Sequence, residues 1–139
     1  MTNLDLATSY MKKAVARLGI LDLLLDAEDY SDVVREAQEI VELALKAMLR
    51  RVGIDPPKWH DVGYILVENE RLFLPDVAKA IPELNRISKS LRRERELSFY
   101  GDIDFIPTEE YSAADSERAY DEAAWVVVLA GEVIERLGR

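Results

Sequence analysis

Apolar residues recur every three or four positions along most of the chain, which is the period of an amphipathic α-helix. The first stripe predicts a long helix over residues 4–26. Its apolar face consists of Leu4, Ala7, Tyr10, Met11, Ala14, Leu18, Leu21 and Leu25. Because no stretch alternates apolar and polar residues as a half-buried strand does, the pattern predicts an all-α protein.

A second stripe begins after Ser31 or Asp32, either of which can cap a helix N-terminus. Gly53 and the pair Pro56-Pro57 end it. Its apolar face consists of Val34, Ala37, Val41, Ala44, Leu45, Met48 and Val52. The opposite face carries Glu36, Glu39, Glu42 and Lys46. This second face is therefore expected to be solvated.

The middle of the chain predicts two further helices that are separated by prolines. Asp61 can cap a short helix that runs to about Glu70, although Gly63 weakens it. Pro75 opens the next helix. Pro82 predicts a bend just before it or the start of a fresh helix, because proline has no backbone N–H to donate.

The apolar stripe of this later helix leads to an arginine. From Pro82 onward the stripe consists of Leu84, Ile87, Ser88 and Leu91. Arg95 then returns to nearly the same angle around the helix axis. A buried guanidinium without a partner is costly, so we expect Arg95 to point inward or into an interface for a specific reason.

Residues 97–112 contain aromatic residues, a glycine and a proline that break the helical period, so an ordered loop is expected there. The last helix is expected to begin near Ser112 or Ser116. Its inner face consists of Tyr120, Ala123, Val127, Ala130, Ile134 and Leu137. The whole pattern predicts an antiparallel bundle of four to five helices with up-down topology. At 139 residues, the chain is expected to form one domain over residues 1–139.

Composition narrows the chemistry that such a bundle can carry. Twenty-seven acidic residues against 18 basic ones give a formal net charge of −9, so non-specific binding of nucleic acid is disfavoured and no DNA partner is expected. Cysteine is absent, which excludes disulfides, thiolate catalysis and cysteine-ligated metals. Arginine outnumbers lysine by 12 to six, which is compatible with a thermophile. Apolar runs are too short for a membrane span and no signal peptide is recognisable, so a cytoplasmic protein is expected.

The single histidine limits metal and acid–base chemistry further. With His60 alone, neither a histidine-assisted di-metal centre nor a zinc site is expected, and we predict no cofactor. A glycine-rich phosphate loop and a nucleophile-elbow serine are also missing. His60 precedes a helix start at Asp61, which favours a structural role over a catalytic one.

One basic run could bind phosphate. Arg92, Arg93 and Arg95 lie shortly before the aromatic pair Phe99 and Tyr100. Arginine binds phosphate well and aromatic rings stack on unpaired bases, so this combination suits a nucleotide or single-stranded RNA. For Arg92 and Arg93 the alternative is structural, because cations near a helix C-terminus offset its dipole.

The loop that follows is acidic. Its carboxylates are Asp102, Asp104, Glu109 and Glu110. Paired carboxylates can bind a hard cation, but their spacing matches no calcium loop. We therefore predict no metal site, and we expect a loop that is solvated or that contacts a second subunit.

The second helix and the segment after it resemble a known family. The residues concerned are Ala37, Glu42, Leu45, Lys46, Ala47, Gly53, Pro57, His60 and Asp61. Together with the long helix before them and the charged helix that leads to an Arg-x4-Tyr step, they resemble the HEPN (higher eukaryotes and prokaryotes nucleotide-binding) domain family. The resemblance implies a helical bundle that homodimerises. It also implies a gene that is frequently a neighbour of a minimal nucleotidyltransferase, as in a toxin–antitoxin pair.

The chain departs from the ribonucleolytic members of this family. Those members cleave RNA without a metal, using an arginine that is followed after four to six residues by a histidine, both in a cleft at the dimer interface. Here Arg95 is followed at that spacing by Tyr100, Gly101 and Asp102, and no histidine occurs after His60. Tyrosine, with an ordinary pKa of about 10, is a poor proton acceptor near neutral pH. The resemblance thus implies Arg95 as a phosphate-binding or interface group, with Tyr100 stacking or hydrogen bonding beside it.

The sequence leaves three functions open. The preferred one is a homodimeric partner of a minimal nucleotidyltransferase that binds a nucleotide or RNA and lacks the ribonuclease histidine. Its binding residues are Arg92, Arg95, Phe99 and Tyr100. The second is a metal-independent ribonuclease toxin in which Arg95 and Tyr100, with Asp102 or Asp104, replace the usual pair. The third is an adaptor without enzymatic activity that docks another protein.

Overall fold

The computed structural model describes residues 2–58 and 61–136, with the side chain of Glu96 excepted. Its helices are α1 (Asn3–Asp26), α2 (Tyr30–Arg51), α3 (Val62–Glu68), the 3₁₀ turn η1 (Glu70–Leu72), α4 (Pro75–Phe99), α5 (Pro107–Glu110) and α6 (Ala113–Arg136). Within these ranges no strand occurs, so the predicted all-α class is confirmed. The interpretations of His60 and Leu137 lie outside the described residues.

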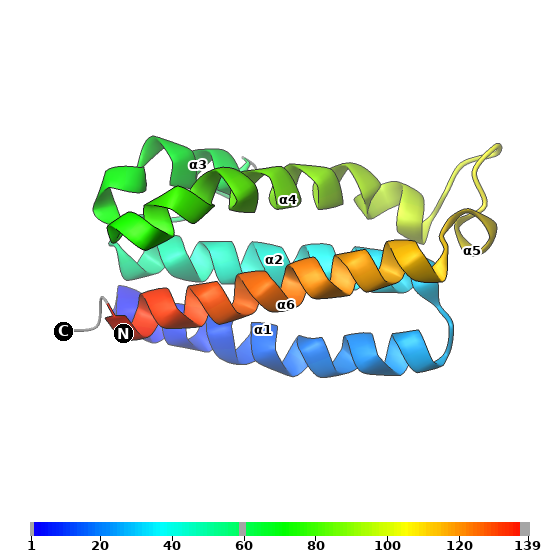
Figure 1. Cartoon of the computed structure of the whole chain (residues 1–139), viewed down its shortest axis with the longest axis horizontal. Helices are drawn as coiled ribbons and strands as arrows, with labels where there is room; N and C mark the ends of the chain where they lie inside the picture. The colour runs from blue at the N-terminus through cyan, green and yellow to red at the C-terminus, as the bar shows by residue number, and fades with distance from the viewer. Residues whose placement is uncertain (1, 59–60, 137–139) are drawn as a thin grey trace.

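The four long helices form the predicted up-down bundle (Figure 1). α1 and α2 make an antiparallel hairpin, and α4 runs along the edge of the bundle opposite α1. α6 returns in front of α2, between α4 and α1. Because α2 packs against α1, α4 and α6, it is the central helix of the core.

α2 can take this central place because its apolar residues cover more than one side of the helix. The buried apolar residues are Val33, Val34, Ala37, Ile40, Val41, Ala44, Leu45, Ala47, Met48 and Leu49. Full burial of a side chain such as valine or leucine stabilises a fold by about 1.5–3 kcal/mol relative to exposure. The interior of the bundle is therefore held together mainly through α2.

Side-chain caps explain where two of the helices begin. Asp61 Oδ1 accepts hydrogen bonds from the backbone N–H of Gly63 at 3.0 Å and of Tyr64 at 3.4 Å. The predicted cap of α3 is thus confirmed. At the start of α6, Ser112 and Asp115 each accept a hydrogen bond from the backbone N–H of the other. This capping box confirms the predicted start near Ser112.

Two predicted boundaries are wrong, and one alternative at Pro82 is excluded. α2 begins at Tyr30 with Asp29 in the N-cap position, and Ser31, a predicted cap, is buried in its first turn. α4 continues through Pro82, which is exposed, so the alternative of a fresh helix is excluded, and the expected bend just before Pro82 stays a prediction. Residues 107–110, predicted as loop, form α5 because the leading proline is already suited to the first turn of a helix.

The short helix α3 packs closely on the first part of α4. A Cβ at Gly63 would lie 2.6 Å from Asn85 Oδ1 and 3.0 Å from Asn85 Cα. Gly63, which was expected only to weaken α3, therefore permits its close approach to α4. α3 begins at the level of Arg92 and runs back toward the start of α4, so the last turns of α4 are not covered by it (Figure 1).

Candidate functional site

The second half of α4 concentrates positive charge on an otherwise acidic chain. Its cations are Arg86, Lys89, Arg92, Arg93 and Arg95, all of them exposed. Two acidic residues, Glu94 and Glu96, lie in the same turns. Glu94 accepts a hydrogen bond from the Tyr111 hydroxyl on the side facing α6, and the side chain of Glu96 lies outside the described part of the chain. The outer surface of these turns is therefore locally positive although the net charge is −9.

Most of these cations line one surface groove of about 680 Å³. Its lining consists of Asp61, Arg86, Lys89, Ser90, Arg92 and Arg93. Arg92 Nη1 lies 3.6 Å from Asp61 Oδ1, next to the N-cap of α3. Lys89 and Arg93 form no ion pair within the described part of the chain. Among the described side chains, Lys89 and Arg93 therefore remain available to an anionic ligand.

Arg95 is not buried. Its side chain is 47% exposed, and its Nη2 lies 3.0 Å from Glu39 Oε1 on α2. The buried side of α4 instead passes from Leu91 to Ser98. The prediction that Arg95 points inward is wrong, because the buried side of α4 follows the seven-residue step from Leu91 to Ser98 and leaves Arg95 at its edge. Its placement in an interface between subunits stays a prediction.

Arg35 on α2 joins this region, although no sequence pattern pointed to it. Its Cζ lies 4.2 Å from the centroid of the Phe99 ring, a cation–π contact that connects the start of α2 to the end of α4. Phe99 remains 45% exposed. The contact joins residues far apart in the sequence, so no local signal could have revealed it.

The structure brings only part of the predicted binding set together. Arg92 lines the groove, whereas Arg95 and Phe99 turn toward α2. Tyr100 is 75% exposed and meets Phe99 edge to face, with 4.8 Å between the ring centroids. Within the described residues, no hydrogen bond or ion pair joins Tyr100 to Arg95. The set therefore consists of a cationic groove and a separate exposed aromatic end.

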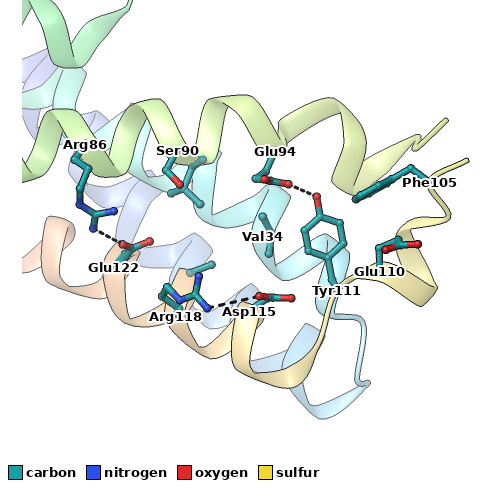
Figure 2. A pocket seen from close by; sticks show the side chains of 12 residues that line it. Val34, Arg86, Ser90, Glu94, Phe105, Glu110, Tyr111, Asp115, Arg118 and Glu122 are labelled. Carbon is teal, nitrogen blue, oxygen red and sulfur yellow. Dashed lines mark hydrogen bonds and ion pairs between the residues drawn. The ribbon is translucent and has the colours of Figure 1, made fainter.

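A second cavity, of about 310 Å³, lies between α4 and α6 (Figure 2). Its charged side chains pair with one another. Arg86 Nη2 lies 2.7 Å from Glu122 Oε2, and Arg118 Nη2 lies 3.6 Å from Asp115 Oδ1. Because its cations are already paired with carboxylates, this cavity is less suited to an anion than the groove on the outer face of α4.

Tyr111 closes one end of this cavity (Figure 2). Its hydroxyl donates a hydrogen bond to Glu94, and its ring packs edge to face on Phe105 with 5.7 Å between centroids. Burial, and then the neighbouring Glu94 carboxylate, raise the pKa of the Tyr111 hydroxyl far above its usual value. The hydroxyl therefore stays protonated at neutral pH and connects the segment before α6 to α4.

A third hollow, of about 490 Å³, lies beside the turn from α1 to α2 and includes Asp29, Asp32 and Phe99 in its lining. Burial, and then a hydrogen bond with Asp29, raise the pKa of Asp32 to about 6. Two adjacent carboxyl groups repel phosphate, so this hollow does not extend the cationic surface.

Comparison with known protein families matches residues 7–137 to the HEPN domain. The match runs from the first turns of α1 to the end of α6 and so spans nearly the whole chain. The chain belongs to the HEPN domain family. The resemblance found in the sequence is thereby confirmed, and at family level it supports a function connected with nucleotides or RNA. Searches of curated proteins and of solved structures give no match.

The alternative catalytic set of this HEPN domain does not form a cluster. Asp102 Oδ1 accepts a hydrogen bond from the backbone N–H of Ile103 at 2.7 Å, inside a tight turn that Asp102 closes with Phe105. Arg95 pairs with α2, and Tyr100 has no described polar contact with it. Asp104 is exposed in the same turn as Asp102. The arginine, the tyrosine and the aspartates of the alternative set therefore do not share one site.

The turn itself is ordered, as predicted. Gly101 has a φ of +71°, and a Cβ there would overlap the carbonyl oxygen of Phe105 and the ring of Pro107. Only glycine fits such a position without strain. The turn holds Ile103 at its tip, where 90% of the side chain is exposed.

Among residues 2–58 and 61–136, no group of three or more histidine, cysteine, aspartate or glutamate side chains could hold a metal ion. No helix in the same ranges is long and apolar enough to cross a membrane.

Proposed function

We propose that this HEPN-family chain binds a nucleotide or a short single-stranded RNA through the second half of α4. The observation that carries the proposal is the cationic groove around Lys89, Arg92 and Arg93, on a chain with a net charge of −9. Guanidinium groups bind phosphate through charge-assisted hydrogen bonds. A chain this acidic is expected to repel phosphates elsewhere, so binding is confined to this face.

The two ends of this face suit different parts of such a ligand. The groove cations hold phosphates, and the exposed rings of Phe99 and Tyr100 offer faces on which bases stack. From Arg86 to Phe99 the helix extends about 20 Å at 1.5 Å per residue. This length accommodates several nucleotides and exceeds the size of a single phosphate group.

Binding without cleavage is proposed because the chain lacks the residue that performs proton transfer in ribonucleolytic relatives. No histidine follows Arg95, and Tyr100 stands apart from Arg95 with an exposed hydroxyl. Family membership further supports a homodimer and a minimal nucleotidyltransferase partner, which we propose as the setting in which the binding face acts.

Fluorescence anisotropy with a labelled single-stranded RNA, at two salt concentrations, tests the binding face. Arg92→Ala and Arg93→Ala should each weaken binding and lower the slope of log affinity against log salt by about 0.7 for each phosphate that is no longer bound. Arg136→Ala is the matched control, because it removes the same charge from the far end of the bundle. Unchanged affinity in the Arg92→Ala/Arg93→Ala double variant would show that the site lies elsewhere.

A variant that should tighten binding makes the test sharper. Asp61→Asn keeps a good N-cap for α3, since asparagine caps a helix as well as aspartate does. It removes the negative charge that lies 3.6 Å from Arg92 Nη1. We therefore expect stronger RNA binding with an unchanged melting temperature, and equal or weaker binding would contradict the role of Arg92.

Incubation of the same protein with RNA in EDTA separates binding from cleavage. We expect the RNA to stay intact. Metal-independent cleavage that disappears in Tyr100→Phe would replace the binding proposal by a ribonuclease in which Arg95 and Tyr100 take part.

A further inference from the structure

An isoleucine stands where turns favour polar residues. The turn of residues 101–106 projects beyond the end of α4, at one end of the bundle (Figure 1). Ile103 at its tip is 90% exposed, and Ile106 at its base is 50% exposed. Glycine, proline, asparagine, aspartate and serine are the usual turn residues, and an exposed isoleucine contributes nothing to the core. A residue that breaks a local rule without a gain inside the chain is typical of a functional surface.

The tip is held in place by the residues around it. Asp102 and Phe105 exchange two backbone hydrogen bonds of 2.9 Å each, and the Phe105 ring packs edge to face on Tyr111. Tyr111 is in turn hydrogen-bonded to Glu94 on α4. A side chain that is already positioned loses little conformational entropy when it binds. Ile103 is therefore suited to be the apolar anchor of a protein interface.

The hollow of about 490 Å³ lies beside the base of this turn. One of its walls is formed by Phe99, Pro107, Thr108 and Tyr111, and the other by residues 27–32. The first wall is largely apolar. This end of the bundle therefore combines an exposed apolar tip with a hollow that can receive an apolar side chain.

The surface around the tip and the hollow is acidic. Between Arg95 and Arg118 the chain has no lysine or arginine. The exposed carboxylates near the tip are those of Asp102, Asp104, Glu109 and Glu110, and those of Glu28, Asp29 and Asp32 line the hollow. None of these carboxylates forms an ion pair within the part of the chain that the structure describes. Such a surface repels RNA and anionic lipid and attracts lysine and arginine.

We propose that the tip and the acidic hollow beside it form a docking surface for a basic segment of another protein, one that combines apolar side chains with lysine or arginine. The apolar side chains of this segment pack on Ile103 and Ile106 and enter the hollow. Its basic side chains pair with the carboxylates around them.

Charge complementarity decides the choice of occupant. Carboxylates without a partner inside the chain are paired only when a cation approaches from outside, and RNA or an anionic membrane meets repulsion here. A second copy of the chain, with a net charge of −9, is disfavoured for the same reason. The proposal goes beyond the proposed function, because it concerns a surface other than the cationic groove on α4.

Peptides selected from a random phage-displayed library on the immobilised full chain provide the probe. We expect the selected sequences to combine apolar residues with lysine or arginine. Fluorescence anisotropy then measures the affinity of the synthesised, labelled peptides. Ile103→Ser should weaken their binding at least about tenfold, because it removes the anchor. Val128→Ser, which alters an apolar side chain that is 62% exposed on α6, is the matched control and should bind them unchanged.

Charge removal tests the acidic part of the surface. The double variant Asp104→Asn/Glu109→Gln should weaken binding of the same peptides and reduce its dependence on salt. Glu132→Gln/Glu135→Gln removes the same charge near the far end of α6 and should have little effect. Equal losses in the two double variants would show that the peptides respond only to net charge, and would overturn the docking surface.

Three further results would overturn the proposal. The first is selected peptides that bind Ile103→Ser as tightly as the unaltered chain, or a selection that enriches none. The second is a dimer of the unaltered chain in sedimentation velocity that Ile103→Ser converts to monomer, which would assign the tip to a second copy. The third is loss of RNA binding in Ile103→Ser, which would assign the tip to the RNA site. Absence of RNA binding by a chain that still binds the peptides would contradict the proposed function alone.

Discussion

Two glycines show how differently the two sides of this bundle are packed. At Gly63 on α3 a Cβ would lie 2.6 Å from Asn85 Oδ1 on α4, so the helices approach as closely as they can. At Gly131 on α6, beside α1, a Cβ would meet nothing within 4 Å. α3 and α4 pack without a gap at Gly63, whereas a groove remains between α1 and α6 at Gly131.

Glycine therefore occurs inside these two helices for two different reasons. Both glycines lower the helix propensity of their segment by a similar amount. At Gly63 the close packing of α3 on α4 compensates for it. At Gly131 no packing within the described chain compensates for it.

Gly63→Ala should have the strongest effect on stability. The added methyl group overlaps Asn85, including its Cα at 3.0 Å, so α3 has to move away from α4. Overpacking of this kind costs about 1–3 kcal/mol. The free energy of unfolding, measured in urea, should fall accordingly, and an unchanged or higher value would contradict the close packing described.

Tyr111→Phe tests a third helix contact, between the start of α6 and α4. It removes the hydrogen bond that the Tyr111 hydroxyl donates to Glu94. A hydrogen bond to a charged group contributes about 1.5 kcal/mol. The comparison variant is Tyr100→Phe, whose hydroxyl has no described partner and whose unfolding free energy should not change. Equal losses in both variants would show that the hydroxyl of Tyr111 has no special role.

Gly131→Ala should act in the opposite direction to Gly63→Ala. The methyl group enters open space and improves helix propensity, so the monomer should gain up to about 1 kcal/mol. Urea unfolding at low protein concentration, where the monomer dominates, measures this gain. A loss of stability there would mean that the α1–α6 groove is filled in solution by this chain itself.

Asp32, at the turn from α1 to α2, should have the weakest effect. Its pKa is raised to about 6, so between about pH 4 and 6 the folded state holds a proton that the unfolded state releases. Stability is therefore greatest at the low end of this range and falls as pH rises through it. Asp32→Asn removes this dependence of stability on pH. The substitution should therefore raise the free energy of unfolding more at pH 7.5 than at pH 4.5, by at most about 1 kcal/mol, since solvent screens this partly exposed group. Equal effects of the substitution at both pH values would argue against the raised pKa.

The long helices could be predicted from the sequence because periodicity and caps act locally. Asp61 and Ser112 could be recognised as caps without any tertiary information. α5 was missed because four residues are too few to show a helical period. The sequence could also not show that α3 and α4 pack through Gly63, because propensity alone treats a helical glycine as a weakness.

The candidate site was predictable only as a set of residue types. The basic run and the aromatic pair after it were evident in the sequence, and the structure places them along α4 and, for Tyr100, in the turn that follows it. The predicted position of Arg95 on the buried side of α4 was wrong, because periodicity alone does not fix which residues face α2 at the end of the helix, and there Arg95 meets Glu39 at the surface. The contact of Arg35 with Phe99 depends on the packing of α2 against α4 and has no local signal.

The central claim is that the second half of α4 binds a nucleotide or single-stranded RNA. Fluorescence anisotropy of a labelled single-stranded RNA with the unaltered chain, with the Arg92→Ala/Arg93→Ala double variant and with Arg136→Ala tests it most directly. We predict salt-sensitive binding that the double variant loses and Arg136→Ala keeps. Equal affinity of all three proteins would contradict the account, because the cationic groove would then play no part in binding.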